Sequence, residues 1–239
     1  KKSKDSEGKR AILSLDYNTL QYSSQEKVKL ASLEAAKTIS GVSQRIKSLY
    51  WAEDAAGQFT FRQVNETMIY SANRIPEIAD DIVNIDNAMR WGFAWKMGPF
   101  EVWDAIGVKK SVAKMKDAGY RIPSWVQEML DSGKESFYKR EAGKLYFYDL
   151  ASKDYKEAPV KPGIILLPSL KDQKKKVEGN KGASLIDIGD GVACLEFHTK
   201  MNAMGDDIVT MVMKSADMML AFSSKNIALS ASPSKAMPK

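Results

Sequence analysis

Apolar residues recur at helical intervals along most of the chain. The clearest case runs from residue 57 to residue 78, where one face carries an apolar side chain every three or four residues. Pro76 lies near its end, where a proline bends or terminates a helix. The apolar positions of this longest predicted helix include Phe61, Val64, Met68, Ile69 and Ala72. The same spacing predicts helices over about residues 26–39, 42–50, 85–92, 99–106, 109–118, 123–130 and 201–219.

Capping residues set the ends of several of these helices. Ser24 offers a hydroxyl to the free N–H groups that begin the first helix, and Gly41 ends it. Pro99 suits the first turn of another helix, because its missing N–H costs nothing there, and Gly107 ends that helix. The side chains that the first helix would bury are Val28, Leu33, Ala36 and Ile39.

Three stretches have the composition of strands. Residues 11–15 form a short apolar strand closed by a turn. A hairpin is predicted over residues 136–148, with Gly143 in its turn. A second hairpin, over residues 183–197, turns at residues 189–191, whose sequence Gly-Asp-Gly is a strong hairpin signal.

Two segments lack a clear period. Residues 158–182 contain prolines, glycine and lysines and are predicted to be a linker, in which only the apolar run 164–167 would dock on a neighbouring part of the protein. The tail 223–239 is rich in Ser, Ala, Lys and Pro. The fold class is therefore mainly α (α+β) with short β-hairpins, and 239 residues suit one large domain or two modest ones.

The net charge of +6 is carried partly by two Lys-rich stretches, residues 1–4 and 171–176. A nucleic-acid site more often interleaves aromatic side chains with its cations or places them on one helix face. Neither stretch does so, and we interpret both as solvated termini or linkers. No apolar run approaches the ~20 residues that span a bilayer, so no membrane or nucleic-acid partner is expected.

The single cysteine and the single histidine restrict the chemistry. Cys194 alone cannot form a disulfide framework or a cysteine zinc site, and we expect a buried, inert thiol. His198 cannot build a multi-histidine metal site, and two side chains four residues apart on one extended segment are too far apart to touch. We therefore expect no metal site, and a chain without disulfides fits a cytoplasmic location.

The start of the chain resembles the hairpin near residue 140. Both stretches have a Gly-Lys pair, then an Asp, then a Tyr at the same interval from that Asp, and basic residues precede each stretch. Chance similarity between two short hairpins is the alternative, but the matching order favours an internal repeat. The matching positions are Gly8, Lys9, Asp16 and Tyr22 in one copy and Gly143, Lys144, Asp149 and Tyr155 in the other.

A specific motif connects the middle of the chain with a known family. Residues 85–92 (Ile-Asp-Asn-Ala-Met-Arg-Trp-Gly) precede residues 97–104 (Met-Gly-Pro-Phe-Glu-Val-Trp-Asp) and Gly107. This arrangement resembles the C-terminal helical domain of 3-hydroxyacyl-CoA dehydrogenases, over roughly residues 61–148. The resemblance implies a multi-helix domain like the C-terminal domain of 6-phosphogluconate dehydrogenase, within a parent protein that oxidises 3-hydroxyacyl-CoA with NAD.

The same resemblance assigns roles to residues of the motif. In that family NAD binds a separate Rossmann domain through a Gly-rich turn, and the catalytic His and its Glu lie on that domain. The chain contains no such turn, so we expect it to bind no NAD and to hold no complete catalytic centre. Asn65 matches the family's substrate-positioning Asn, although a structural role is the preferred interpretation. Trp91, Trp95 and Trp103 are expected to pack in the core or between domains. A helix-start packing role is expected for Gly98, Pro99 and Phe100, and a capping or pairing role for Asp104.

The sequence after residue 182 resembles a different family. Residues 187–193 and 201–204 resemble the opening hairpin and first helix of crotonase-fold enoyl-CoA hydratases. Lys200 would then be a candidate contact for a CoA phosphate, with an ordinary surface lysine as the preferred alternative. The oxyanion hole and catalytic Glu residues of that family are expected beyond this chain. Residues 221–229 resemble the first oxyanion-hole segment only faintly, because its glycine and its preceding strand are missing.

These patterns together predict a fragment of a fatty-acid β-oxidation enzyme with an architectural role, completing the helical layer of the dehydrogenase. Its partners would be acyl-CoA in the parent protein and the Rossmann, first helical-repeat and crotonase domains of the same polypeptide, with homo-oligomerisation left open. The alternatives are a free-standing, non-catalytic acyl-CoA-binding homologue and a basic helical binding module. The expected segments are residues 1–25 (end of a preceding repeat), 26–157 (helical domain), 158–182 (linker) and 183–239 (truncated start of a crotonase-like domain).

Overall fold

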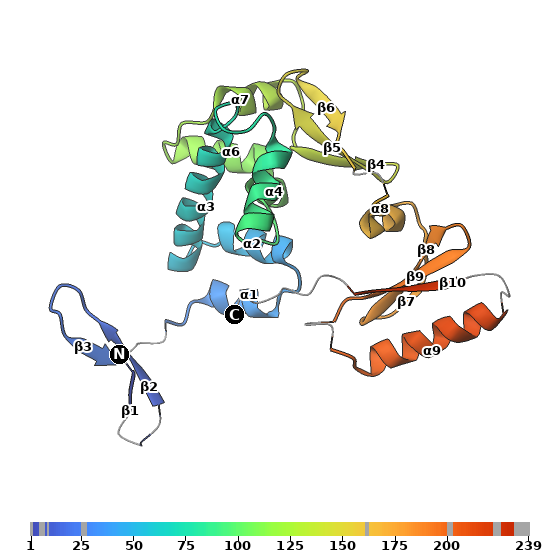
Figure 1. The fold of residues 1–239 in the computed structure, drawn as a ribbon. Coiled ribbons are helices and arrows are strands. Elements are labelled where there is room, and N and C mark those ends of the chain that lie inside the picture. The colour runs from blue at the N-terminus through green and yellow to red at the C-terminus, as the bar shows by residue number, and fades with distance from the viewer. Residues whose placement is uncertain are drawn as a thin grey trace. The chain divides into compact units, whose positions relative to one another are not determined.

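The computed structural model describes residues 2–4, 8, 10–24, 28–160, 163–199, 203–221 and 226–231. The chain divides into two compact units, Lys1–Val64 and Asn65–Lys239, and the boundary falls inside one long helix. Figure 1 labels the helices and strands of both units.

The first unit opens with a three-stranded antiparallel sheet and continues as helices. The sheet has the order β1-β2-β3, and the predicted strand 11–15 is confirmed as the central β2. Asp54 ties two of the following helices together, because its carboxylate accepts hydrogen bonds from the backbone N–H and hydroxyl of Ser32 and from the N–H of Gly57. The elements are β1 (Lys2–Lys4), β2 (Arg10–Leu15), β3 (Tyr22–Ser24), α1 (Ala31–Thr38), α2 (Val42–Tyr50) and the first half of α3 (Ala55–Asn73).

The predicted helix over residues 26–39 is the main error in this unit. Ser24 pairs with Leu13 at the end of β3, so its backbone belongs to the sheet and it caps no helix. The helix α1 begins only at Ala31. Val28, predicted to be buried, is 70% exposed, and Leu33 is exposed as well, whereas Ala36 is buried as expected.

The helices of the second unit agree closely with the sequence prediction. The helix α3 ends at Asn73, three residues before Pro76. The helix α5 begins at Pro99 and ends at Ile106, as the flanking signals indicated. The elements after α3 are α4 (Ile82–Gly92), α5 (Pro99–Ile106), α6 (Val108–Asp117) and α7 (Ser124–Asp131). The predicted mainly α architecture with short sheets is thus confirmed.

Aromatic side chains form the centre of the helical core. The Phe137 ring lies 5.1 Å from the Phe100 ring and 5.2 Å from the Trp103 ring, between centroids. Trp125 of α7 contacts both phenylalanines, and its indole N–H donates to the carbonyl of Ala72 on α3. Aromatic side chains bury large areas and favour such tilted contacts, so this cluster holds α3, α5 and α7 together.

A second antiparallel meander, of order β4-β5-β6, packs on these helices. Its first turn has both Ala142 and Gly143 at positive φ, the geometry of a tight hairpin turn. Tyr148 of β5 stacks on Trp125 with ring planes 9° apart. The predicted hairpin is confirmed, whereas β6 was not predicted. The strands are β4 (Tyr138–Glu141), β5 (Lys144–Asp149) and β6 (Asp154–Glu157).

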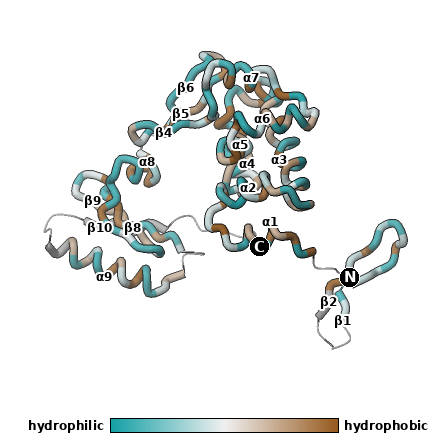
Figure 2. Tube along the Cα trace, turned by 180° about the vertical axis from the view of Figure 1, so that it is seen from behind, coloured by the Kyte–Doolittle hydropathy of each residue, from teal (hydrophilic) through white to brown (hydrophobic). Residues whose placement is uncertain are grey.

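The C-terminal part has a four-stranded sheet of order β10-β9-β8-β7, in which β10 runs parallel to β9. Residues of β8 and β9 pack against Ile208 and Met211 of α9, and hydrophobic stretches lie along these strands (Figure 2). The predicted hairpin is confirmed; the helix begins at Asp206 rather than residue 201, and β10 lies in the tail where no strand was predicted. The strands and helix are β7 (Lys176–Gly179), β8 (Ala183–Gly189), β9 (Val192–Phe197), α9 (Asp206–Ala221) and β10 (Asn226–Ala231).

The segment 158–182 contains regular structure. It holds the helix α8 (Leu167–Asp172) as well as β7. Lys171 forms an ion pair with the largely buried Glu196 of β9, so the Lys-rich stretch is partly fixed to the sheet rather than fully solvated. None of the helices in the described part of the chain is both long and apolar enough to cross a membrane.

Candidate functional site

Asp86 of α4 supplies the cap for the start of α5. Its carboxylate accepts hydrogen bonds from the N–H of Phe100 (2.9 Å) and the N–H of Glu101 (3.0 Å), two groups that a helix N-terminus leaves without partners. Gly98 makes this approach possible, since a Cβ there would lie 2.3 Å from the Asp86 side chain. Glu101 turns back to accept from the Gly98 N–H at 2.8 Å. The Gly-Pro-Phe-Glu motif is therefore a helix-start packing device, as the sequence indicated.

Asp104 and Tyr138 connect this cap to the β4–β5 hairpin. Asp104 accepts hydrogen bonds from the N–H of Phe137 (2.7 Å) and the N–H of Tyr138 (2.8 Å). The Tyr138 hydroxyl donates to the Asp86 carboxylate at 3.0 Å. The expected capping role of Asp104 is confirmed, and its partners are the first residues of the hairpin. Two carboxylates thus join α4, α5 and β4.

Burial controls the ionisation of this network. Burial raises the pKa of Asp86 to about 7. The hydrogen bond from the Phe100 N–H acts in the opposite direction and lowers this pKa, but burial has the larger effect. Burial likewise raises the pKa of Asp104 to about 7, against the hydrogen bonds from the hairpin backbone. The pKa of Tyr138 is raised too, first by burial and then by the nearby Asp86 charge. The tyrosine therefore stays a neutral donor.

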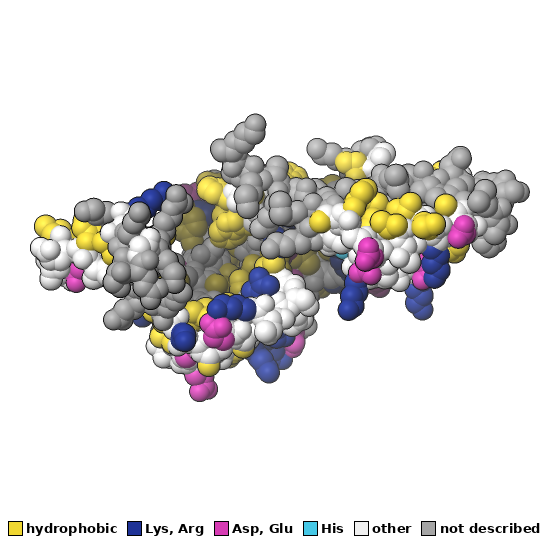
Figure 3. All heavy atoms as spheres, turned by 90° about the horizontal axis from the view of Figure 1, so that it is seen from below, with side chains coloured by type: hydrophobic (Ala, Val, Ile, Leu, Met, Phe, Trp, Pro, Cys, Tyr) yellow, Lys and Arg dark blue, Asp and Glu magenta, His cyan; other side chains and the backbone are white. Residues whose placement is uncertain are grey.

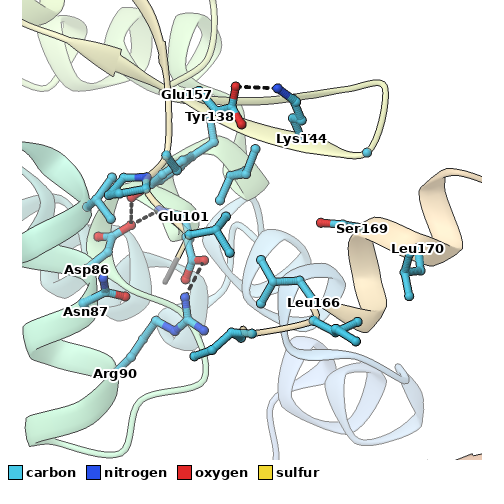
Figure 4. A pocket seen from close by; sticks show the side chains of 18 residues that line it. Asp86, Asn87, Arg90, Glu101, Tyr138, Lys144, Glu157, Leu166, Ser169 and Leu170 are labelled. Carbon is cyan, nitrogen blue, oxygen red and sulfur yellow. Dashed lines mark hydrogen bonds and ion pairs between the residues drawn. The ribbon is translucent and has the colours of Figure 1, made fainter. Parts of the chain in front are cut away.

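A pocket with a volume of about 360 Å³ lies against this network. Asp86, Asn87 and Arg90 line one side, and residues of α8, including Leu166 at its N-terminal boundary, line the opposite side (Figure 4). The hairpin closes a third side. The apolar lining comes largely from the segment before and within α8: Val160, Ile164, Ile165, Leu166 and Leu170.

The charged groups of the pocket are matched within the protein. Arg90 pairs with Glu101 at 3.2 Å, and Lys144 pairs with Glu157 at 2.8 Å. The lining contains no imidazole or thiol, and the Asp86 carboxylate is occupied by three hydrogen bonds. The arrangement suits the binding of a ligand better than proton transfer or nucleophilic attack.

The two residues singled out for substrate contact are not brought together at this pocket. Asn65 lies on α3 with 0% of its side chain exposed and is absent from the pocket lining. Lys200 lies outside the described residues. The tryptophans also separate: Trp103 is buried and donates to the Ser111 hydroxyl at 2.9 Å, whereas Trp91 and Trp95 are exposed. Packing in the core is therefore wrong for these two, whereas packing between domains stays a prediction.

His198 forms a second polar cluster, on the C-terminal sheet. Its Nε2 lies 2.9 Å from the Ser184 hydroxyl, and its Nδ1 lies 3.6 Å from the Glu196 carboxylate. This order resembles a hydroxyl–imidazole–carboxylate triad, but Ser184 is buried and Glu196 already pairs with Lys171, so no substrate can reach the hydroxyl. Cys194 is buried, as expected. Among the described residues, no three His, Cys, Asp or Glu side chains are placed to share a metal ion.

Comparison with known proteins identifies the helical part. The family model for the 3-hydroxyacyl-CoA dehydrogenase C-terminal domain matches residues 59–146. A "Probable 3-hydroxyacyl-CoA dehydrogenase" of Bacillus subtilis (strain 168) is 46% identical over 208 residues, which are 87% of this chain and 26% of that protein. A "Putative fatty acid oxidation complex trifunctional enzyme" of Rickettsia felis is 30% identical over 97 residues, which are 41% of this chain and 12% of that protein.

The match covers only part of those relatives: the chain spans about a quarter of the length of the Bacillus protein, 26%. No solved structure matched the chain. Residues 59–146 nevertheless include the whole Asp86, Gly98 and Asp104 network just described. These residues therefore match the 3-hydroxyacyl-CoA dehydrogenase C-terminal domain, in a chain that is similar to part of a probable 3-hydroxyacyl-CoA dehydrogenase.

Proposed function

We propose that the chain is the architectural, helical part of an NAD-dependent enzyme that oxidises 3-hydroxyacyl-CoA in fatty-acid β-oxidation. One observation carries this proposal: the family motif is occupied in holding the domain together. The carboxylates of Asp86 and Asp104 accept hydrogen bonds from backbone N–H groups, and Asn65 is fully buried. Side chains used in this way complete a helical layer; they do not contact a substrate.

NAD does not fit the residues present. A dinucleotide site needs a Gly-rich turn at a helix N-terminus to hold its pyrophosphate, and the sequence contains no such turn. The cations of the described pocket, Arg90 and Lys144, are paired with carboxylates. In this proposal NAD and the catalytic base belong to a Rossmann domain elsewhere in the parent polypeptide, and no chemical step is assigned to this chain.

The internal repeat supports a second helical unit in the parent. Adding 133 to each residue number of the β2–β3 hairpin gives the pairing of the β5–β6 hairpin: the cross-strand pair Leu15–Tyr22 becomes Tyr148–Tyr155. The Thr19 N–H donates to Asp16, and the Ser152 N–H donates to Asp149. Leu20 and Lys153 both have positive φ, 56° and 55°. We infer that residues 1–25 are the closing meander of a preceding helical unit.

The C-terminal topology supports the start of a hydratase domain. The hairpin β8–β9 leads through α9 to β10, which adds parallel to β9. The sequence predicted a hairpin and a helix only, and the extra strand β10 overlaps residues 221–229, the segment that faintly resembles the first oxyanion-hole segment of the crotonase fold. We propose that residues 183–239 begin an enoyl-CoA hydratase domain whose catalytic residues lie beyond this chain, in a cytoplasmic fusion enzyme.

Of the two alternatives, the pocket favours the acyl-CoA-binding homologue over the basic helical module. Lys171, the first lysine of the basic stretch 171–176, is held by Glu196, and Lys214 is held by Glu178. Lysines that are already paired with carboxylates attract an acidic partner only weakly. The pocket, in contrast, has the volume and apolar lining of a small-molecule site.

An activity assay tests the proposal directly. The chain alone and the parent polypeptide are each mixed with NAD and 3-hydroxybutyryl-CoA, and NADH formation is followed by absorbance. We expect turnover by the parent and none by the chain. Turnover that the Asn65→Ala variant of the chain abolishes would contradict the architectural role. A parent that oxidises no 3-hydroxyacyl-CoA would refute the assignment itself.

A further inference from the structure

A groove of about 620 Å³ lies where α3 ends beside the start of α7. The Trp125 indole N–H donates to the Ala72 carbonyl at this place, which holds the two helices against each other (Figure 1). The last turns of α3 contribute Ile69 and Asn73 to the wall, and the connection from α6 into α7 contributes residues 120–124. We call this hollow the α3–α7 groove. Its volume lies within the range of small-molecule sites.

Three exposed polar side chains line the α3–α7 groove: the amide of Asn73, the guanidinium of Arg121 and the hydroxyl of Ser124. Within the part of the chain that the structure describes, none of the three forms an ion pair or a side-chain hydrogen bond, and no carboxylate lines the groove. All three can donate hydrogen bonds. The groove therefore offers one unmatched positive charge and further donors to an anion.

This chemistry differs from that of the pocket beside α8. There, Arg90 pairs with Glu101, and Lys144 pairs with Glu157, so each cation already has a carboxylate. A planar guanidinium without a partner donates two parallel hydrogen bonds to a carboxylate. Arg121 is thus a candidate for binding an anionic group from outside the described chain.

The rest of the groove wall indicates what the anion carries. Ile69, Ile122 and Pro123 line the groove together with the aromatic ring of Tyr120. Ile69 and Ile122 are only partly buried, so a ligand with an apolar body would remove more of their surface from water. An inorganic anion would cover the cation and leave this surface wet, whereas a carboxylate on an apolar body covers both.

We propose that the α3–α7 groove binds small organic carboxylates, with the carboxylate paired with Arg121 and the apolar body against Ile69, Ile122 and Pro123. This site goes beyond the proposed function and does not rest on it, because neither NAD nor a thioester is needed to occupy it. Since Arg121 is exposed, solvent and salt screen its charge. The expected dissociation constant is therefore on the order of 1 mM.

Four small probes separate the charge from the apolar body. Benzoate, benzamide, acetate and inorganic phosphate are each titrated into the full chain at low ionic strength, and NMR follows the resonances of the groove. Benzoate is expected to bind saturably. Benzamide keeps the ring and lacks the charge, and acetate keeps the charge and lacks the ring, so both are expected to bind roughly three- to tenfold more weakly. Phosphate that binds more tightly than benzoate would show a phosphate site and overturn the choice of a carboxylate.

A matched pair of substitutions tests the cation. Arg121→Gln is expected to weaken benzoate binding by roughly three- to tenfold and to leave benzamide binding unchanged, because it removes only the charge. Arg62→Gln makes the same change at an exposed arginine of α3 outside the groove and is expected to alter neither. Both side chains are exposed, so both variants are expected to keep the fold, which circular dichroism checks.

The assignment is wrong if benzoate does not bind, if benzamide binds as tightly as benzoate, or if Arg121→Gln and Arg62→Gln have equal effects. Benzoate binding by the chain and not by the parent polypeptide would also overturn it, because another part of the parent would then cover the groove. None of these measurements depends on hydride transfer. A parent without dehydrogenase activity would refute the proposed function, and benzoate binding could still be measured, so the two proposals can fail separately.

Discussion

At the scale of single residues, Gly98 is the position with the least freedom in the cap of α5. A Cβ added there would lie 2.3–2.4 Å from atoms of Asp86, so either the cap or the α4–α5 contact must move. We expect Gly98→Ala to lower the free energy of unfolding by about 1–3 kcal/mol, as overpacking does. Urea denaturation measures this change.

Gly92 provides the control for that substitution. It is the last residue of α4, and a Cβ there meets nothing within 4 Å. Gly92→Ala is therefore expected to be neutral or slightly stabilising, since alanine loses less chain entropy on folding than glycine. Equal destabilisation by both variants would show that Asp86 does not approach Gly98 as closely as described.

The buried carboxylates make stability depend on pH. Burial raises the pKa of Asp86 and Asp104 from the ordinary value of 3.8 to about 7. The folded state then binds more protons than the unfolded state between about pH 4 and pH 7, so stability falls as pH rises through that range and levels off above it. We expect a loss on the order of 2 kcal/mol per group between pH 5 and pH 8, measured by urea denaturation.

Neutral variants separate this contribution from the rest of the chain. The double variant Asp86→Asn and Asp104→Asn is less stable, because an amide cannot accept all the hydrogen bonds, but its pH slope is expected to disappear. Asp117→Asn, at an exposed position on α6, should keep the slope. A wild-type chain that gains stability as pH rises would mean that the hydrogen bonds to the carboxylates outweigh their burial.

At the scale of elements, the sequence predicted best where local signals act alone. The ends of α5 were predicted correctly, because local chain geometry at Gly98, Pro99 and Gly107 sets them. Ser24 failed as a cap because pairing with Leu13, eleven residues earlier, decides its conformation. The strand β10 was missed for the same kind of reason: its register is set by β9, across the whole of α9. Pairing between distant segments leaves little local pattern.

The candidate site shows the same division. Asp86 and Asp104 stand in the family motif and were within reach of sequence analysis. Tyr138 could not be predicted from the sequence. Its hydroxyl donates to Asp86, which is 52 residues away in the sequence, and no pattern near Tyr138 indicates that contact. The pocket was also out of reach, since eight of its 18 lining residues come from the predicted linker 158–182, for which the sequence indicated a docking run at residues 164–167 but not its partner.

The β4–β5 turn gives a prediction at this scale. Ala142 has a φ of 49°, a left-handed conformation that costs a residue with a Cβ roughly 1 kcal/mol. We expect Ala142→Gly to raise the midpoint of thermal unfolding, because it removes this strain and produces a Gly-Gly turn suited to the hairpin. Ala151→Gly, at a nearby turn position without positive φ, is the control and should lower the midpoint or leave it unchanged.

At the scale of the whole molecule, the β2–β3 and β5–β6 hairpins have the same cross-strand register but differ in their surroundings. Tyr148 is 2% exposed beneath Trp125, whereas its counterpart Leu15 is 48% exposed. Exposed apolar side chains also lie on α9, at Val209, Val212 and Met213 (Figure 3). Apolar surface of this kind often marks contacts with another part of a protein, which fits the proposal that the parent polypeptide supplies further domains.

Equivalent substitutions in the two meanders test that proposal. Tyr148→Asp places a charge where an aromatic ring is buried and should cost about 3–5 kcal/mol. Leu15→Asp in the chain alone should change stability by no more than ~0.5 kcal/mol, as at an ordinary surface position. In a longer polypeptide that includes the preceding helical unit, Leu15 would take the place of Tyr148 beneath a helix like α7, and Leu15→Asp should then be strongly destabilising. Denaturation of both forms of the protein measures the difference. If Leu15→Asp is harmless in the longer form as well, the first meander does not close a helical unit, and the repeat is a similarity of two hairpins only.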